Sequence, residues 1–259
     1  MKHKSHLVIP DSHSQPGHDN ARFTALGHWI VEHQPDVIIN IGDMADMKSL
    51  SMYDVGKLSA EGRRYCDDIA AFHDAMEKLL APIKKYNSTC RSKRKKKYTP
   101  RMVYCLGNHE DRINRAYHND PKYYGTISID DLKLEEYGWE VQPFCVPIII
   151  DDIAYSHYFP SGVLMKPIGG INHARKLLNT QFMSATAGHS HLRDFAEHSN
   201  AGGRKFCATV VGCFFEHDEG WAKGANRMYW RGIVHKKNVH KGSYDPDFIS
   251  IQELRRTYG

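Results

Sequence analysis

Five short runs of β-branched and aromatic residues each lead into a polar side chain, and this recurrence constrains the fold more than any other feature of the sequence. The runs HLVIP, DVIIN, MVYCL, IAYS and ATA are followed, after at most two further residues, by Asp11, Asp43, Asn108, His157 and His189. Runs of this length and composition are typical of strands. Because sites in open α/β sheets form at the carboxyl ends of strands, we expect these five side chains to face one site.

Helical patterns separate these runs. The clearest has apolar residues every three or four positions, at Tyr65, Ile69, Phe72, Met76, Leu79 and Ile83, which predicts a helix packed on a sheet. Residues 20–34, with Asp19 as N-cap, predict a second helix, and residues 128–137 and 172–182 predict two more. After His191 the runs RDFAEHS, KFCATVVGCFF, RGIVHKK and DFISIQEL predict antiparallel strands. Since no repeat or linker interrupts this order, we expect a single domain over residues 1–259.

Most of the excess positive charge lies in one segment. Residues 84–101 contain nine Lys or Arg and no acid, and removing those nine charges from the formal net charge of +5 leaves the rest of the chain at −4. Lysine-rich segments bind phosphate backbones through counterion release, and Tyr86 and Tyr98 could stack on unpaired bases. The alternative is a solvated, mobile loop. We interpret this basic insertion as a nucleic-acid-binding segment that leads a polyanion toward Asn108.

Seven polar residues near the predicted strand ends form a candidate metal-binding set. Side chains two apart on an extended backbone point to the same face, so Asp11 with His13, and His189 with His191, can each converge on one cation. Imidazole and carboxylate ligands without thiolates favour a divalent transition metal over magnesium, calcium or structural zinc. Seven ligands suit two ions that share a carboxylate. The set is Asp11, His13, Asp43, Asn108, His157, His189 and His191.

The series DSH, GDMAD, GNHE, a lone histidine after a strand and GHSH resembles the calcineurin-like metallophosphoesterase superfamily, whose five signature blocks follow the same order. The resemblance implies an α/β fold: a four-layer α/β/β/α sandwich of two mixed sheets flanked by helices. It also implies phosphoester hydrolysis with two divalent ions. We expect Mn²⁺, with Fe, Zn or Ni as alternatives. Stand-alone enzymes of this size also resemble those that phages encode.

The resemblance implies a role for each residue of these blocks. Asp43 would bridge the two ions, His109 would be the catalytic histidine, and Asp46 would orient it. The remaining ligands would divide between a first ion held by Asp11, His13 and His191 and a second held by Asn108, His157 and His189.

Several residues outside the metal set are candidates for other roles. Arg112 and Arg115 follow GNHE closely and could bind a phosphate, although solvent-facing helix arginines are commoner. Glu110 could cap the following helix, and His217 could lie at the substrate rim. The tentative substrate-binding residues of the basic insertion are Lys93, Arg94, Lys95, Lys96 and Lys97.

Three functions fit these residues. The first is a phosphodiesterase acting on DNA or RNA, a nuclease that uses the basic insertion for affinity. The second is a phosphomonoesterase acting on phosphoprotein or small phosphoesters, although GDMADMKS stands where protein phosphatases of the superfamily have GDxVDRG. The third is a non-catalytic nucleic-acid-binding module, which would need neither Asp46 nor His109.

The expected cellular location follows from three features that the sequence lacks. No run approaches the roughly 18 apolar residues of a membrane-spanning helix, and the N-terminus shows no export signal. The six cysteines form no CxxC pair, and without an export signal we do not expect them to form a disulfide framework. We expect a cytoplasmic protein, in the host cytoplasm if it is viral.

Overall fold

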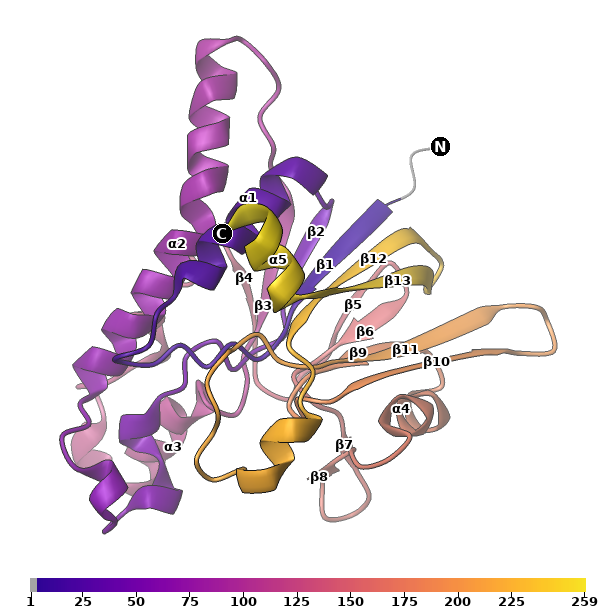
Figure 1. Ribbon diagram of the computed structural model, residues 1–259. Helices are drawn as coiled ribbons and strands as arrows, with labels where there is room; N and C mark the ends of the chain where they lie inside the picture. Colours follow the sequence, from indigo (N-terminus) through magenta and orange to yellow (C-terminus); the bar gives the residue numbers. More distant parts are fainter. Residues whose placement is uncertain (1–3) are drawn as a thin grey trace.

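The computed structural model describes residues 4–259, and its helices and strands form four layers (Figure 1). The first sheet has the strand order β13-β12-β1-β2-β3-β4 and the second the order β10-β11-β9-β6-β5, with β7 and β8 forming a separate pair. Both large sheets are mixed. Strands β1 to β4 pair in parallel, as do β11-β9-β6, while the remaining neighbours are antiparallel. This is the α/β/β/α sandwich expected from the sequence.

The strands of the first sheet are β1 (Lys4–Ile9), β2 (Val37–Asn40), β3 (Arg101–Cys105), β4 (Glu140–Gln142), β12 (Gly232–His240) and β13 (Ser243–Ser250). Those of the second are β5 (Ile148–Ile150), β6 (Ile153–Tyr155), β9 (Ser184–Ala187), β10 (Arg193–Ser199) and β11 (Lys205–Val211), and the separate pair is β7 (Pro160–Ser161) with β8 (Lys166–Pro167). The α-helices are α1 (Ala21–His33), α2 (Tyr65–Ser92), α3 (Asp111–Asn119), α4 (His173–Gln181) and α5 (Ile251–Tyr258). The 3₁₀ helices are η1 (Lys48–Leu50), η2 (Met52–Asp54), η3 (Leu58–Ala60), η4 (Pro121–Tyr123), η5 (Ile129–Leu132) and η6 (Lys223–Met228).

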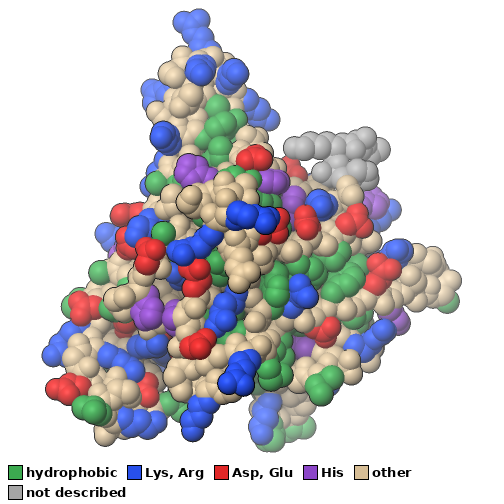
Figure 2. Space-filling view, in the orientation of Figure 1, with side chains coloured by type: hydrophobic (Ala, Val, Ile, Leu, Met, Phe, Trp, Pro, Cys, Tyr) green, Lys and Arg blue, Asp and Glu red, His purple; other side chains and the backbone are tan. Residues whose placement is uncertain are grey.

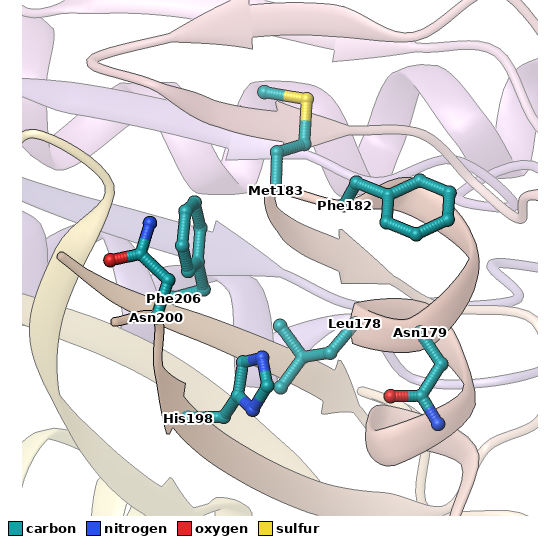
Figure 3. A pocket seen from close by; sticks show the side chains of 7 residues that line it. All are labelled: Leu178, Asn179, Phe182, Met183, His198, Asn200 and Phe206. Carbon is teal, nitrogen blue, oxygen red and sulfur yellow. The ribbon is translucent and has the colours of Figure 1, made fainter. Parts of the chain in front are cut away.

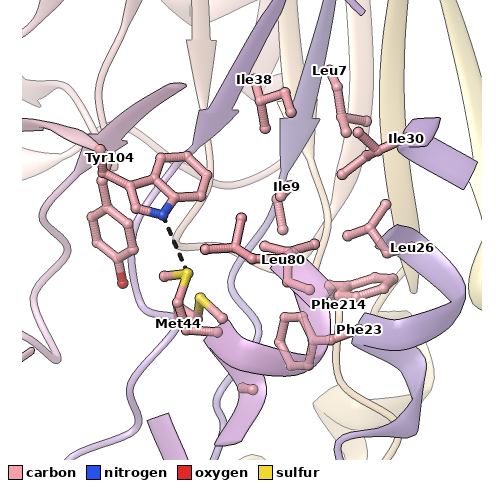
Figure 4. Close-up of a cluster of buried hydrophobic side chains, with 14 of the residues drawn as sticks. Leu7, Ile9, Phe23, Leu26, Ile30, Ile38, Met44, Leu80, Tyr104 and Phe214 are labelled. Carbon is pink, nitrogen blue, oxygen red and sulfur yellow. Dashed lines mark hydrogen bonds between the residues drawn. The ribbon is translucent and has the colours of Figure 1, made fainter. Parts of the chain in front are cut away.

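Three apolar layers hold the four structural layers together. Alternate residues of β1 serve two of them: Leu7 and Ile9 face the helices α1 and α2, whereas Val8 faces the second sheet. Figure 4 shows Leu7 and Ile9 beside Leu26 and Ile30 of α1. A fully buried side chain of this kind contributes about 1.5–3 kcal/mol. Because both faces of the strand are buried, its sequence is a nearly continuous apolar run, which explains why the run predicted a strand so clearly.

The third apolar layer lies between the second sheet and α4. Ala174 and Leu177 of α4 pack on Ala185 and Ala208 of β9 and β11. Small residues on these strands let the helix approach the sheet closely. The helix predicted over residues 172–182 is therefore confirmed, and it forms the outer layer opposite α1 and α2 (Figure 1).

Several predicted elements differ from the observed ones. Residues 128–137 form only the short η5, because Lys133 has a left-handed backbone that ends the helix after Leu132. The last apolar run divides: β13 ends at Ser250, whose hydroxyl accepts a hydrogen bond from the backbone of Glu253 and caps α5. Four short strands, β4, β5, β7 and β8, were not predicted, since each has at most three residues and carries little periodic signal.

Helix α2 is longer than its apolar stripe predicted. It continues from Tyr65 to Ser92, a length of about 42 Å at 1.5 Å per residue. The first half of the basic insertion is therefore helical and projects beyond the sheet (Figure 1). Residues 84–97, which we call the basic tip, contain eight of the nine cations of the insertion. Figure 2 shows Lys and Arg side chains gathered over this projecting end.

None of the helices in the described part of the chain, residues 4–259, combines the length and the apolar character needed to cross a membrane.

Candidate metal centre

The five strand-end side chains meet where the two sheets' carboxyl ends face each other. Asp11 follows β1, Asp43 follows β2 and Asn108 follows β3, while His157 and His189 follow β6 and β9 of the other sheet. The expectation of a shared site at strand ends is met by the geometry. The sandwich itself creates the site, because each sheet contributes only part of it.

The first of two adjacent groups contains Asp11, His13 and His191, whose ligand atoms lie within 4.8 Å of one another. Asp11 Oδ2 lies 3.2 Å from Nε2 of His191. All three residues are buried. The arrangement places one carboxylate and two imidazoles around a single point.

The second group contains Asp43, His157 and His189, again within 4.8 Å. Asp43 Oδ2 lies 3.2 Å from His157 Nε2, and the side-chain oxygen of Asn108 lies 3.0 Å from the same nitrogen. Asp43 Oδ2 is also 3.9 Å from His13 Nε2, in the first group. Asp43 thus touches both groups, as a bridging carboxylate must.

The backbone brings these residues together differently from the extended geometry that the spacing suggested. His13, Asp43, His189 and His191 all have positive φ, between 42° and 64°, a conformation that costs a non-glycine residue about 1–2 kcal/mol. His189 and His191 consequently belong to different groups. The prediction that each pair separated by two converges on one cation is therefore wrong for this pair, because the chain turns sharply there.

Two positions near the centre must be glycine because a carboxylate lies directly against the backbone there. A Cβ on Gly107 would overlap the carboxylate of Asp43, and one on Gly188 would overlap that of Asp11. The glycine of GNHE therefore allows β3 to end directly against the candidate bridging residue. It does not serve a turn with positive φ.

The ring nitrogens fit a pair of divalent cations. Nδ1 of His157 lies 3.1 Å from the carbonyl oxygen of Ile41 and must donate to it, so Nε2, which faces Asp43 and Asn108, is the nitrogen that can bind an ion. Nε2 of His13 is buried with no hydrogen-bond partner among residues 4–259. An unpaired buried nitrogen is costly unless something binds it. The donor set of imidazole, carboxylate and amide oxygen, without thiolate, is that of a borderline transition metal.

His109 and Asp46 lie beside the two groups. Nδ1 of His109 donates to Asp46 Oδ1 at 3.1 Å, and Nε2 lies 3.7 Å from Asp43 Oδ2. Arg112 donates to His109 Nε2 at 3.0 Å and to the carbonyl of Asp46 at 2.8 Å. The neutral His109 ring is therefore held at both nitrogens, one facing the candidate metal centre. Arg112 reaches the site, whereas Arg115 lies at the rim, half-exposed, with one hydrogen bond to the Asn108 carbonyl.

Burial and mutual charge set the protonation of the centre. Burial raises the pKa of Asp43, but the neighbouring His109 and His157 outweigh it and hold that pKa well below its usual value. Burial lowers the pKa of His157, yet Asp43 and Asp11 prevail and raise it to about 9. For His189, burial followed by the charge of His157 lowers the pKa to about 4. Without ions, a proton on His157 thus supplies part of the positive charge that the carboxylates attract.

Glu110 has a role that the sequence analysis missed. It is fully buried and accepts hydrogen bonds from the backbone N–H groups of Asp43, Ala45 and Gly107 and from the hydroxyl of Tyr104. Its side chain makes no capping hydrogen bond to α3, so the expected helix cap is wrong. The carboxylate instead fastens the loop after β2 to the loop after β3.

Glu219 was also missed. It is buried, and its carboxylate accepts a hydrogen bond from Nδ1 of His13 at 2.9 Å and contacts Nε2 of His217 at 3.1 Å. Its only sequence signal was the neighbouring His217, which does lie close to the centre. Glu219 is separated from His191 by 27 residues, so no spacing rule connects it to the motifs.

The basic tip lies far from this centre. Lys93 to Lys97 precede the amino end of β3, whereas Asn108 follows its carboxyl end. The first turns of α2 adjoin the centre, since Asp68 accepts from the backbone of Ser49 in η1, and the tip is at the other end of that helix (Figure 1). The expectation that the insertion leads directly to Asn108 does not match this geometry. Tyr98 is buried and donates to the carbonyl of Pro35, so it cannot stack on a base.

A separate surface hollow of about 440 Å³ lies between the end of α4 and the β10-β11 hairpin (Figure 3). It is lined by Leu178, Phe182, Met183 and Phe206, together with three polar side chains. None of its lining residues belongs to the metal groups. The chemistry of the candidate centre therefore does not extend into this hollow.

Comparison with known proteins finds similarity to solved structures and to a family model. A dimetal phosphatase from Danio rerio has 8% sequence identity to the chain, with 97% of both chains covered and a TM-score of 0.44. No curated protein matches the chain. The model of the calcineurin-like phosphoesterases matches residues 6–205, a span that includes all five motif blocks and both metal groups. The chain therefore belongs to the calcineurin-like phosphoesterase family.

Proposed function

We propose that the protein is a dinuclear phosphodiesterase that cleaves nucleic acid, DNA or RNA. The observation that carries the hydrolytic part is the pair of ligand groups joined by Asp43, with His109 and Asp46 directly beside them. A site that only stabilised the fold would need no histidine held at the edge of the metal groups. We further propose the seven ligands in the roles described above, one domain for the whole chain, and a cytoplasmic location.

The residues of the site have separate roles in hydrolysis. Two divalent ions bound at such a centre lower the pKa of a water and neutralise charge on the phosphoryl oxygens. Asp46 accepts the Nδ1 proton of His109, so Nε2 carries the lone pair: it can take up a proton from water once it is free and then pass that proton to the leaving oxygen. Arg112 now occupies that nitrogen. A substrate phosphate would draw the guanidinium toward itself and free Nε2, since arginine binds phosphate more strongly than a neutral imidazole.

The preference for nucleic acid rests on the basic tip. Its eight cations are exposed and its segment contains no acid, which suits a phosphate backbone held without sequence specificity. A small phosphomonoester would gain nothing from charges so far from the metal groups. The tip is therefore an argument for a long polyanion and against a small substrate.

The separation of tip and centre makes substrate length the critical variable. The two ends of α2 are about 42 Å apart, a distance that corresponds to roughly 12 nucleotides at the 3.4 Å rise of a strand in duplex DNA. A six-nucleotide substrate can reach the centre but not the tip at the same time. A 30-nucleotide substrate can contact both.

The test compares substrates and charge variants in the presence of Mn²⁺. The substrates are bis-p-nitrophenyl phosphate, p-nitrophenyl phosphate, and single-stranded oligonucleotides of six and 30 nucleotides. One variant replaces three lysines of the tip with Gln, and a matched control replaces three exposed lysines of the strand hairpins. The tip residues are Lys95, Lys96 and Lys97, and the control residues are Lys205, Lys237 and Lys241.

We expect turnover of the diester to exceed that of the monoester. For the tip variant, the slope of log binding constant against log salt concentration should become shallower by about 0.7 per lost charge with the 30-mer. This variant should also cleave the 30-mer more slowly. The six-mer, the small diester and the control variant should be unaffected. Preference for the monoester would instead support the phosphatase hypothesis, and failure to cleave any substrate with Mn²⁺, Fe²⁺, Zn²⁺ or Ni²⁺ would leave only nucleic-acid binding. The same metal series tests our proposal that Mn²⁺ is the native ion.

A further inference from the structure

The loop between β11 and η6 brings a buried carboxylate to the metal centre. Glu219 is 1% exposed, although charged residues are seldom fully buried without partners. Its backbone is held by Asn226, whose side-chain oxygen accepts from the Glu219 N–H at 2.9 Å and whose amide donates to the Glu219 carbonyl at 2.9 Å. The position of the carboxylate is therefore fixed by the loop itself.

That carboxylate determines which nitrogen of His13 faces the ligand group. Nδ1 of His13 lies 2.9 Å from Oε1 of Glu219 and donates to it. The proton must then be on Nδ1, so Nε2 carries the free lone pair. Nε2 is the buried nitrogen with no hydrogen-bond partner among residues 4–259. His13 is also packed between the rings of His109 and Phe215 at 4.5 and 4.8 Å, which prevents the ring from tilting.

The neighbourhood of Glu219 resembles a further metal site, because His13, Asp46, His217 and Glu219 have ligand atoms within 4.8 Å of one another. The ammonium of Lys48 already lies between two of these carboxylates, 3.3 Å from Asp46 Oδ2 and 3.4 Å from Glu219 Oε2. It supplies the positive charge that a further ion would bring. The cluster is thus a support for the centre, in which Lys48 links the residue that holds His13 to the one that holds His109.

We propose that Glu219 is a positioning residue for the first metal ion: it fixes the Nδ1–H tautomer and the orientation of His13 so that Nε2 binds the ion. Histidine ligands commonly donate their other ring N–H to a carboxylate, and loss of such a partner typically weakens metal affinity by about 10–100-fold. The proposal deepens the proposed function, since it relies on His13 as a ligand. Glu219 itself lies outside residues 6–205, the span that the family model matches.

The first experiment measures metal binding without catalysis. Zn²⁺ is titrated calorimetrically into metal-free wild-type protein, Glu219→Ala, Glu219→Gln and the control Asp218→Asn, whose side chain is 75% exposed and pairs with Arg231 at the surface. In Glu219→Ala we expect one of two binding steps to weaken by about 10–100-fold while the other is unchanged. Glu219→Gln, which keeps an oxygen acceptor, should recover part of the loss, and Asp218→Asn should match wild type.

The second experiment detects the tautomer directly. Long-range ¹H–¹⁵N spectra of the zinc-loaded protein should show Nδ1 of His13 protonated in wild type and in Glu219→Gln, with His13→Gln identifying the signal. If Glu219→Ala fails to fold, the Glu219→Gln spectra and titration decide the question. Unchanged affinities in every folded Glu219 variant, or equal weakening of both steps together with a lower melting temperature, would overturn the proposal. Failure of nuclease activity alone would leave these two readouts intact and refute only the proposed function.

Discussion

The two ends of the first sheet carry opposite kinds of charged residue. At the carboxyl end, buried carboxylates accept hydrogen bonds from backbone N–H groups, and the His157 imidazole donates one to a backbone carbonyl. At the amino end, beyond β3, the basic tip exposes Lys93 to Lys97 to solvent. Chemistry on a phosphoester needs placement within a fraction of an ångström. Affinity for a polyanion needs only a high density of positive charge. The basic tip can therefore project from the fold without hydrogen bonds that fix each side chain.

The largest effect should follow from the residue common to both metal groups. Asp43→Asn keeps an oxygen that can accept from the His109 backbone but removes the bridging charge. We expect turnover to fall by at least about 10⁴-fold, equivalent to about 5.5 kcal/mol, and metal content after dialysis to drop for both ions. Plasma mass spectrometry measures the metal. Retention of two ions with normal turnover would exclude Asp43 as a bridge.

A smaller loss should follow when only proton delivery is removed. His109→Ala should lower turnover by about 10²–10⁴-fold, the usual contribution of a positioned acid. Metal content should remain at the wild-type value, since His109 is held by Asp46 and Arg112. Loss of an ion in this variant would show that His109 is a ligand and not the general acid.

The pH dependence separates two histidines of the same metal group. In the ion-free protein, Asp43 and Asp11 overcome burial and raise the pKa of His157 from 6.5 to about 9. Its charged form thus stabilises the ion-free fold below about pH 6.5, and this contribution is lost as the pH rises toward 9. An ion must displace that proton, whereas His189, with a pKa of about 4, is already neutral.

Mn²⁺ affinity should therefore rise by about 100-fold between pH 6.5 and 8.5, or tenfold per pH unit for one displaced proton. Calorimetry in two buffers of different ionisation enthalpy should report at least about one proton released per ion pair bound at pH 7. An affinity that does not change over this range would contradict the protonation of His157. No such dependence is expected for salt-sensitive binding at the basic tip.

Stability should also depend on which end of the sheet is altered. In Glu110→Gln, an amide N–H₂ replaces one of two oxygens that accept from four donors. We expect the free energy of unfolding to fall by about 1.5–3 kcal/mol. The control Glu140→Gln breaks only the half-exposed pair with Arg101 near the basic end, which is worth about 0–1 kcal/mol. Urea unfolding of both variants tests the difference, and equal losses would contradict it.

Much of the fold could be predicted because its central strands are largely buried on both faces. The runs that became β1, β2 and β3 have continuous apolar sequences, and helix α4 was recognised from local periodicity. Residues 128–137 were misjudged because their helical pattern ends at Lys133, where a left-handed backbone stops η5. The last segment was misjudged because the apolar pattern continues from β13 into α5. In both cases the change of conformation is made by one or two residues, which a periodic signal averages away.

The sequence by itself determined the chemical identity of the centre, because short motifs place Asp, Asn and His directly after strands and leave thiolates out. Only the tertiary structure decided how those residues are supported. Glu110 and Glu219 act on loops 67 and 206 residues away, and such partners depend on how the two sheets pack. The basic tip lies at the opposite end of the sheet from the metal groups because β3 runs between them. A strand is extended and does not turn back, so the residues that precede it and the residues that follow it lie at opposite ends of the sheet.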